Sequence, residues 1–221
     1  MRAYFRLTAN TEPVKFDYQH DLVGVLHRLL GTNEIHDAMS LYSFSWLDGG
    51  MREGDALNFP RGASWFVSAF DDGLICDLAK NALQNKNFIY GMQLDNVRIV
   101  NTPEFHSQHR FKVASPVLAK CKMIDGQVKH LVYSEEGSND ILTQTLKHKM
   151  DAAGLSKFTD GVKVSFDASY DKAKTKLVNI KDVSSRASMC PVIVKGSKTA
   201  IQFAWNVGIG NSTGCGFGAL R

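Results

Sequence analysis

The stretch Asn-Val-Gly-Ile-Gly-Asn-Ser-Thr-Gly-Cys-Gly-Phe-Gly-Ala-Leu, residues 206–220, decides how the rest of the sequence is interpreted. Five glycines fall within eleven positions: Gly208, Gly210, Gly214, Gly216 and Gly218. Glycine adopts positive φ readily and lets another backbone approach closely, although it loses more conformational entropy on folding than other residues. We therefore expect a loop that is held by groups outside it and whose N–H groups cradle an extended anion. Phosphate is the expected ligand.

The common nucleotide-binding motifs do not fit this stretch. A Walker A loop needs Lys and then Ser or Thr after its last glycine, and a dinucleotide-binding loop needs a helix after its third glycine. Here Phe217 and Gly218 lead directly to the last residues. The alternative is a glycine-rich linker or tail. Ile209 and Phe217 argue against it, because each lies between two glycines, as a packed residue would.

The order Gly-hydrophobic-Gly, five residues, Gly-hydrophobic-Gly near the C-terminus of a chain of this length resembles the CRISPR repeat-processing endoribonucleases. These enzymes belong to the repeat-associated RNA-binding superfamily. The resemblance implies an α+β fold of tandem ferredoxin-like (βαββαβ) domains, an RNA-binding glycine loop and no cofactor. It also implies CRISPR repeat RNA as the partner, with an effector complex or a homodimer as further partners.

The composition is that of an ordinary globular protein. With 221 residues, 44% hydrophobic and 22% charged, the chain has room for one large domain or two of about 110 residues. No apolar run reaches the ~18 residues that span a bilayer, and the first residues lack a signal-peptide core. We expect a cytoplasmic protein with no membrane partner. Four cysteines without a Cys-x-x-Cys motif indicate reduced thiols rather than a zinc site or disulfides.

Positive charge is concentrated in the half that contains the glycine-rich stretch. Residues 1–112 hold 11 basic and 13 acidic side chains, whereas residues 113–221 hold 15 and 9. This asymmetry favours a polyanion bound mainly by the second half.

The first half has a regular alternation of predicted elements. We expect strands over 1–9, 40–47, 64–70 and 97–100, and amphipathic helices over 20–30 and 72–84, the first followed by Gly31 as its C-terminal cap. The order βαββαβ is the ferredoxin-like signature. The sequence thus predicts an N-terminal domain over residues 1–108.

The second half, residues 109–221, is predicted to be a degenerate repeat of the same fold. Only one helix is evident, over 139–153, and short strands are expected over 162–166, 175–181, 191–195 and 199–207. A hairpin and the glycine loop would then replace the second helix. A Ser-Pro at 115–116 followed by apolar residues also resembles the start of the second domain in the family.

His36 is the first candidate for a catalytic residue. Histidine can take and give a proton near neutral pH, as metal-free RNA cleavage requires. His36 follows the first predicted helix and precedes the strand over 40–47, and in the family that this chain resembles, a histidine in that position is the general acid or base. A surface histidine without a role is the alternative.

His27 is the second candidate, because it lies seven residues after His20 on the same helical stripe. Both histidines are otherwise explained by the margin of an amphipathic helix. The family often adds a lysine, yet Lys15 is the only lysine among the first fifty residues. The group that stabilises charge on phosphorus is therefore not identified by the sequence.

Two further groups complete the predicted site. The backbone of the five glycines, with the side chains of Asn211, Ser212 and Thr213, is expected to hold RNA phosphates. Lys172, Lys174 and Lys176 alternate on a predicted strand and form a positive strip, unless they only protect a sheet edge. His106 and His109 have no carboxylate or thiolate at ligand spacing, so a domain junction is the better explanation and no metal is expected.

The sequence therefore predicts a metal-independent endoribonuclease that cuts CRISPR repeat transcripts and leaves a 2′,3′-cyclic phosphate and a 5′-hydroxyl. Two alternatives stay open. One is a non-catalytic RNA-binding scaffold subunit of the same superfamily. The other is a protein that binds a nucleotide or small anion.

Overall fold

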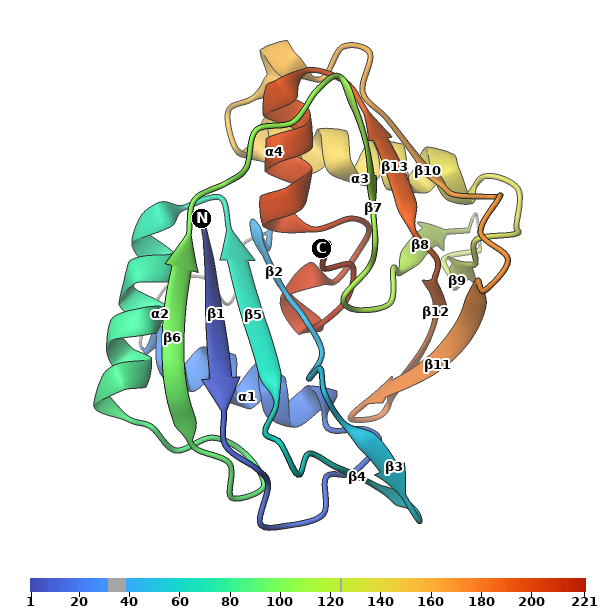
Figure 1. The fold of residues 1–221 in the computed structure, drawn as a ribbon. Helices are drawn as coiled ribbons and strands as arrows, with labels where there is room; N and C mark the ends of the chain where they lie inside the picture. The colour runs from blue at the N-terminus through green and yellow to red at the C-terminus, as the bar shows by residue number, and fades with distance from the viewer. Residues whose placement is uncertain (32–38, 124) are drawn as a thin grey trace.

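The first half of the chain forms a four-stranded antiparallel sheet with two helices on one face (Figure 1). The computed structural model describes residues 1–31, 39–123 and 125–221. The elements of this unit are β1 (Arg2–Leu7), α1 (Gln19–Leu30), β2 (Tyr42–Phe44), β5 (Ser64–Ala69), α2 (Asp72–Gln84) and β6 (Leu94–Val100). The strand order β2-β5-β1-β6 is that of a ferredoxin-like fold, which confirms the predicted βαββαβ arrangement.

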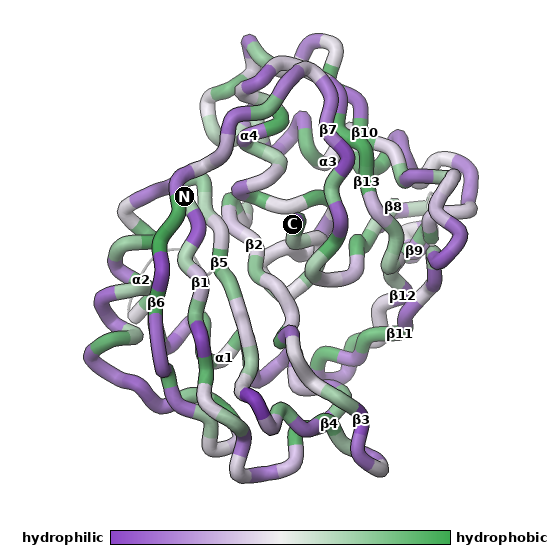
Figure 2. The backbone as a smooth tube through the Cα atoms, in the orientation of Figure 1, coloured by the Kyte–Doolittle hydropathy of each residue, from purple (hydrophilic) through white to green (hydrophobic). Residues whose placement is uncertain are grey.

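Alternation along β1 fixes which face of this sheet is covered. Ala3, Phe5 and Leu7 are buried with the apolar residues of α1 and α2, and hydrophobic and hydrophilic residues alternate along the strand in Figure 2. The Asp71 side chain caps α2 by accepting a hydrogen bond from the Gly73 N–H at 2.8 Å. A hairpin of β3 (Met51–Glu53) and β4 (Ala56–Asn58), which the sequence did not predict, extends between β2 and β5.

The second half repeats the topology with two hairpins added. Its elements are β7 (Gln108–Phe111), β8 (Ala119–Lys122), β9 (Val128–Leu131), α3 (Ser138–Ala152), the short 3-10 turn η2 (Ser156–Phe158), β10 (Lys163–Phe166), β11 (Lys174–Ile180), β12 (Val183–Met189), β13 (Val192–Lys195), α4 (Lys198–Val207) and the 3-10 turn η3 (Thr213–Cys215). The sheet order is β10-β13-β7, and Leu220 pairs with Val113, just beyond β7, where a fourth strand would lie.

The expected strand over 199–207 is wrong, because these residues form α4. Ser197 caps this helix, its Oγ accepting a hydrogen bond from the Ala200 N–H at 3.2 Å. Nearly every residue after the first turn is buried, yet Lys198, Gln202 and Asn206 recur at every fourth position, a helical period that the expected strand overlooked. The second unit therefore has two helices like the first. It departs from the repeat by the inserted hairpins and by the fourth strand, which is reduced to a single bridge.

Arg2 joins the two units. Its side chain is 1% exposed, and its guanidinium lies between the rings of Phe66 and Trp205, 3.9 and 3.7 Å from their centroids. The same group donates hydrogen bonds to the carbonyl oxygens of Leu220 at 2.8 Å and Trp205 at 3.3 Å. A cation from β1 thus stabilises both the end of α4 and the last residues of the chain.

Replacing Arg2 by methionine is expected to lower the free energy of unfolding by about 3 kcal/mol. The change leaves two buried carbonyl oxygens without a donor and removes two cation–π contacts. Urea denaturation measures the loss. Arg6→Met, at an exposed position on the same face of β1, is the control and should change stability by less than about 1 kcal/mol. Equal stability of both variants would contradict this role for Arg2.

Candidate functional site

The glycine-rich stretch leaves α4 and packs between the two units. Ile209 and Phe217 are buried, as their position between glycines indicated. The Ile209 N–H donates to the Gly218 carbonyl oxygen at 2.9 Å, so the two arms of the loop contact each other. At Gly218, where φ is +65°, an added Cβ would overlap the carbonyl oxygen of Ile209. The glycines here permit backbone contact that no other residue allows.

Much of the loop backbone is hydrogen-bonded within the protein. The N–H groups of Asn211 and Gly218 donate to Leu118 and Pro116, both at 2.8 Å, and those of Gly208 and Gly216 donate to Ala204 and Thr213. These four N–H groups are not available to a phosphate. The phosphate-binding hypothesis is thereby restricted to the loop tip, which we define as residues 211–215. In this tip Asn211 and Ser212 are partly exposed and Cys215 is exposed.

The loop also contacts the first unit directly. The Trp46 indole N–H donates to the Gly216 carbonyl oxygen at 2.9 Å. A Cβ at Gly214 would overlap the hydroxyl of Ser40, so this glycine lets the loop lie against the segment that enters β2. Helix α1, which carries His20 and His27, packs against η3 of the loop. His20 is exposed and His27 is partly exposed.

A pocket of about 190 Å³ lies at the loop tip. Its lining residues come from three parts of the chain: Met39, Ser40, Thr145, His148, Lys149, Asn211, Ser212 and Thr213. His36, the first candidate for catalysis, lies outside the described residues, and only two residues separate it from Met39 in the sequence. The pocket therefore combines the loop tip with the segment that follows His36.

Two lysines that are not among the predicted site residues reach the loop tip. Lys149 of α3 donates to the Thr213 hydroxyl oxygen at 2.9 Å and is only 4% exposed. Lys120 of β8 reaches the Ser212 hydroxyl oxygen at 3.2 Å, and its backbone N–H donates to the Asn211 side chain at 2.8 Å. A signal for Lys149 was present, because the residue shares the apolar stripe of α3 with Leu142, Leu146 and Met150.

Burial lowers the pKa of Lys149 to about 7. Between that pH and the ordinary value of 10.5, the unfolded chain holds a proton on this residue that the folded protein lacks. Lys149 therefore makes the folded protein more stable as the pH rises through this window. Below about pH 7 its buried charge has its full destabilising effect.

Lys149→Met is thus expected to be more stable than the wild type at pH 6.5, with an advantage on the order of 4 kcal/mol that shrinks toward pH 10. Urea unfolding at pH 6.5 and 9.5 measures this difference. Lys147→Met, on the same helix and partly exposed, should show no such pH dependence. A Lys149→Met advantage that is equal at both pH values would disprove the assignment.

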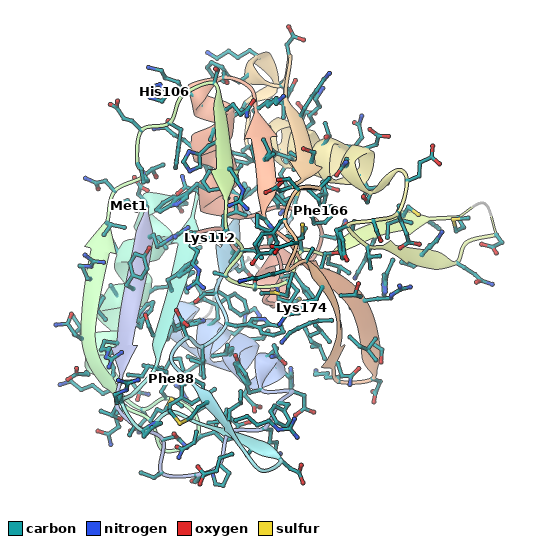
Figure 3. All side chains as sticks on the ribbon, turned by 45° about the vertical axis from the view of Figure 1, so that its right-hand side comes forward. Met1, Phe88, His106, Lys112, Phe166 and Lys174 are labelled. Atoms are coloured by element: carbon teal, nitrogen blue, oxygen red, sulfur yellow. The ribbon has the colours of Figure 1, made fainter. Side chains whose placement is uncertain are left out.

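Basic side chains from the second unit gather in a pocket of about 340 Å³ beside the junction. Its lining includes Arg110, Lys112, Tyr170, Lys172, Lys174 and Arg221. Asp167 and Asp48 partly neutralise Arg110 and Arg221, with 2.7 and 2.9 Å ion pairs. Lys112, Lys172 and Lys174 form no ion pair within the described part of the chain. Lys112 and Lys174, labelled in Figure 3, lie toward the middle of the molecule between the two units.

The three predicted strip lysines do not all lie together. Lys172 is in the turn before β11, and it shares the basic pocket with Lys174, the first residue of that strand. Lys176 instead lies over the ring of Trp46, 4.9 Å from its centroid. The observed cluster thus contains two of the predicted lysines, with Lys112 and two arginines added from distant segments.

Aromatic residues continue from the basic pocket across the junction. An adjoining pocket of about 260 Å³ shares Val113, Met189 and Arg221 with it, and is also lined by Tyr4, Trp46 and Phe66. We call these two pockets the interdomain groove. Binding sites for single-stranded nucleic acids combine two components: positive side chains along the phosphate backbone, and aromatic rings on which bases stack.

Of the pair His106 and His109, only the second contacts aromatic rings of the described residues. The His109 ring lies 4.8 and 4.4 Å from the rings of Phe105 and Phe111, at the entry to the second unit. Within residues 1–31, 39–123 and 125–221, no three His, Cys, Asp or Glu side chains are grouped so that they could hold a metal ion. None of the described helices is long and apolar enough to cross a membrane.

Two ferredoxin-like units with a glycine-rich loop packed between them define the class of protein. Residues 100–221 match the model of the family described as CRISPR associated protein Cas6, C-terminal. The chain therefore belongs to the Cas6 family. Membership supports a role in CRISPR RNA processing or RNA binding.

Solved structures share the whole fold at low sequence identity. A Cas6-related protein from Pyrococcus furiosus superposes with a TM-score of 0.86 at 19% identity, over 100% of this chain and 97% of that one. A RAMP protein described as binding different RNA substrates gives 0.85 at 18%, over 100% and 98%. A Cas6 product complex gives 0.70 at 12%, over 100% and 99%. Comparison with curated proteins finds no significant match.

Proposed function

We propose that this protein binds CRISPR repeat RNA in the interdomain groove and cuts it at the pocket beside the loop tip. The observation that carries the proposal is the groove itself, in which the cations of the second unit adjoin the partly exposed Tyr4 and Trp46 of the first. Three of those cations, Lys112, Lys172 and Lys174, have no acidic partner among the described residues. A polyanion with stackable bases satisfies both kinds of side chain.

The proposed reaction is a transesterification that needs no metal. A base removes the proton from a 2′-hydroxyl, and the oxygen attacks the adjacent phosphorus in line. The bond from phosphorus to the 5′-oxygen breaks as an acid protonates that oxygen, which leaves a 2′,3′-cyclic phosphate and a 5′-hydroxyl. Donors at the site stabilise the added charge on phosphorus.

His36 is proposed as the general acid or base, with His27 as the second group. Support comes from the sequence position of His36 next to the lining residues Met39 and Ser40, and from the packing of α1 against η3. Asn211, Ser212 and Thr213 are proposed to contact RNA phosphates at the loop tip. Gly208, Gly210, Gly214, Gly216 and Gly218 would serve the site mainly by shaping this loop. The protein would act in the cytoplasm and pass its product to an effector complex, with a homodimer as a further possible assembly.

The test is incubation of the full chain with a 5′-labelled repeat RNA in excess EDTA. We expect one cut per repeat, with a product whose 3′ end resists ligation until the cyclic phosphate is removed. Repeat RNA in which deoxyribose replaces the ribose at the cut position is the control, because it lacks the attacking 2′-hydroxyl and should bind uncut. A protein that binds repeat RNA tightly but leaves it intact would be the scaffold subunit instead.

The groove makes a separate prediction about salt. Changing Lys112, Lys172 and Lys174 together to glutamine is expected to reduce the slope of log affinity against log salt for single-stranded RNA by about 2, at about 0.7 for each phosphate contact. Filter binding between 50 and 300 mM salt measures the slope. The matched control changes Lys80, Lys86 and Lys157, which are exposed outside the groove lining. If long RNA binds no better than a mononucleotide, the small-anion alternative holds.

A further inference from the structure

One wall of the pocket at the loop tip contains residues that the proposed reaction does not use. Thr145, His148 and Lys149 lie within little more than one turn of α3, and residues three and four apart on a helix share a face. His148 and Lys149 bring an imidazole and an ammonium group to this wall, whereas the Thr145 hydroxyl donates its proton to the Ile141 carbonyl oxygen at 2.7 Å. The opposite wall is the loop tip, and Ser40 of the first unit lies at its edge.

The charge of Lys149 is not balanced by any acidic group that the structure describes. Its ammonium contacts only neutral oxygens, the Thr213 hydroxyl at 2.9 Å and the Val207 carbonyl at 3.5 Å. None of the residues that line this pocket is acidic. A cation that is almost fully removed from water is destabilised unless an anion comes close, so this wall favours an anionic ligand.

The second lysine of the site adds to the positive electrostatic potential at the loop tip. Lys120 approaches the loop tip from β8 and contacts the Ser212 hydroxyl, one residue before the Thr213 contact of Lys149. Positive groups from two elements therefore hold neighbouring residues of the loop tip. The pocket volume of about 190 Å³ equals that of roughly six waters, which accommodates a phosphate group.

We propose that the pocket at the loop tip binds one phosphate of the RNA strand, at or next to the cleavage position. His148 contacts this phosphate directly, and Lys149 acts as a positioning residue that holds Thr213 against it. The inference rests on the proposed function for the identity of the strand. It assigns a lysine of the second unit to the phosphate, where Lys15 is the only lysine among the first fifty residues.

A first experiment tests the pocket without RNA, with sulfate as the probe. The imidazole carbon-bound protons are followed by NMR as sulfate is added to the full chain, and His148→Gln identifies the His148 signals. We expect a saturable shift of His148 in the wild type. Lys149→Met should weaken sulfate binding about 10-fold or more, while Lys147→Met should leave it unchanged. A His148 signal that does not move with sulfate would overturn the proposal.

A second experiment uses repeat RNA. His148→Gln and Lys149→Met are each expected to slow single-turnover cleavage about 10- to 100-fold, the loss that follows removal of a hydrogen bond to a charged group. Each should also lower the salt slope of RNA binding by about 0.7, which a purely structural effect would not do. Lys147→Met is again the control. Because Lys149→Met is expected to be more stable than the wild type, unfolding would not explain a loss of cleavage in this variant, and His148→Gln with the sulfate titration gives an independent readout.

The outcomes separate this inference from the proposed function. If the wild type cleaves repeat RNA and both variants match it in rate and salt slope, the pocket assignment is wrong while the ribonuclease proposal stands. If the wild type leaves RNA uncut but His148 responds to sulfate in a Lys149-dependent manner, the anion site stands without the cleavage reaction.

Discussion

Replacing His36 by alanine should lower the rate of repeat-RNA cleavage by about 10²- to 10⁴-fold, the usual contribution of a positioned acid or base. The affinity for RNA should not change, because the groove and the loop tip contain the proposed binding residues. Single-turnover cleavage at saturating protein measures the rate, and filter binding measures the affinity. His27→Ala is expected to have a smaller effect on the rate.

His106→Ala is the control for this prediction. His106 is exposed in the segment that connects the two units, and it lines neither the groove nor the pocket. Its loss should leave the cleavage rate within about twofold of the wild type. A His36→Ala protein that cuts at the wild-type rate would remove His36 from the mechanism and direct attention to His27 and His20 on α1.

Gly218→Ala is expected to destabilise the protein by at least about 3 kcal/mol. The backbone at Gly218 has φ +65°, and the added methyl group would overlap the Ile209 carbonyl oxygen, which belongs to backbone and cannot rotate away. Positive φ in a non-glycine residue costs about 1–2 kcal/mol by itself. The overlap adds the cost of moving the two arms of the loop apart. Thermal and urea unfolding measure the loss.

Gly161→Ala separates the two contributions. Its φ of +67° nearly equals that of Gly218, but nothing lies within 4 Å of the position of its Cβ. This variant should lose only about 1–2 kcal/mol. If Gly218→Ala is no less stable than Gly161→Ala, the close contact between the loop arms does not determine the shape of the loop.

Amphipathic helices were the part of the fold that the sequence predicted best. The helix over 72–84 matches α2, because Asp71 caps its start and its apolar residues recur on one face. Helix α4 was missed although Lys198, Gln202 and Asn206 recur at helical spacing, because the segment is short and mostly apolar, and such a run is easily read as a strand. The hairpins of β3–β4 and β8–β9 pair few residues, so alternation gives them little signal.

Prediction of the site was limited by contacts between distant segments. The glycines correctly indicated close backbone approach, but a sequence does not say which backbone approaches. Here the partners are the other arm of the loop, the segment around Ser40 and residues 116–118. Several N–H groups expected to face phosphate donate to protein carbonyls instead, among them those of Pro116 and Leu118. Lys149 was passed over because lysine is normally solvated. Its contact with Thr213 joins residues 64 positions apart.

The contacts of Arg2 have a consequence for the proposed binding of RNA in the groove. This one side chain contacts the end of α4, the last residues and the sheet of the first unit, so it links the two units before any ligand arrives. The protein then loses little conformational entropy when RNA binds. Most of the entropy loss comes from ordering the RNA. RNA segments that are already extended should therefore have an advantage over folded ones that must first open.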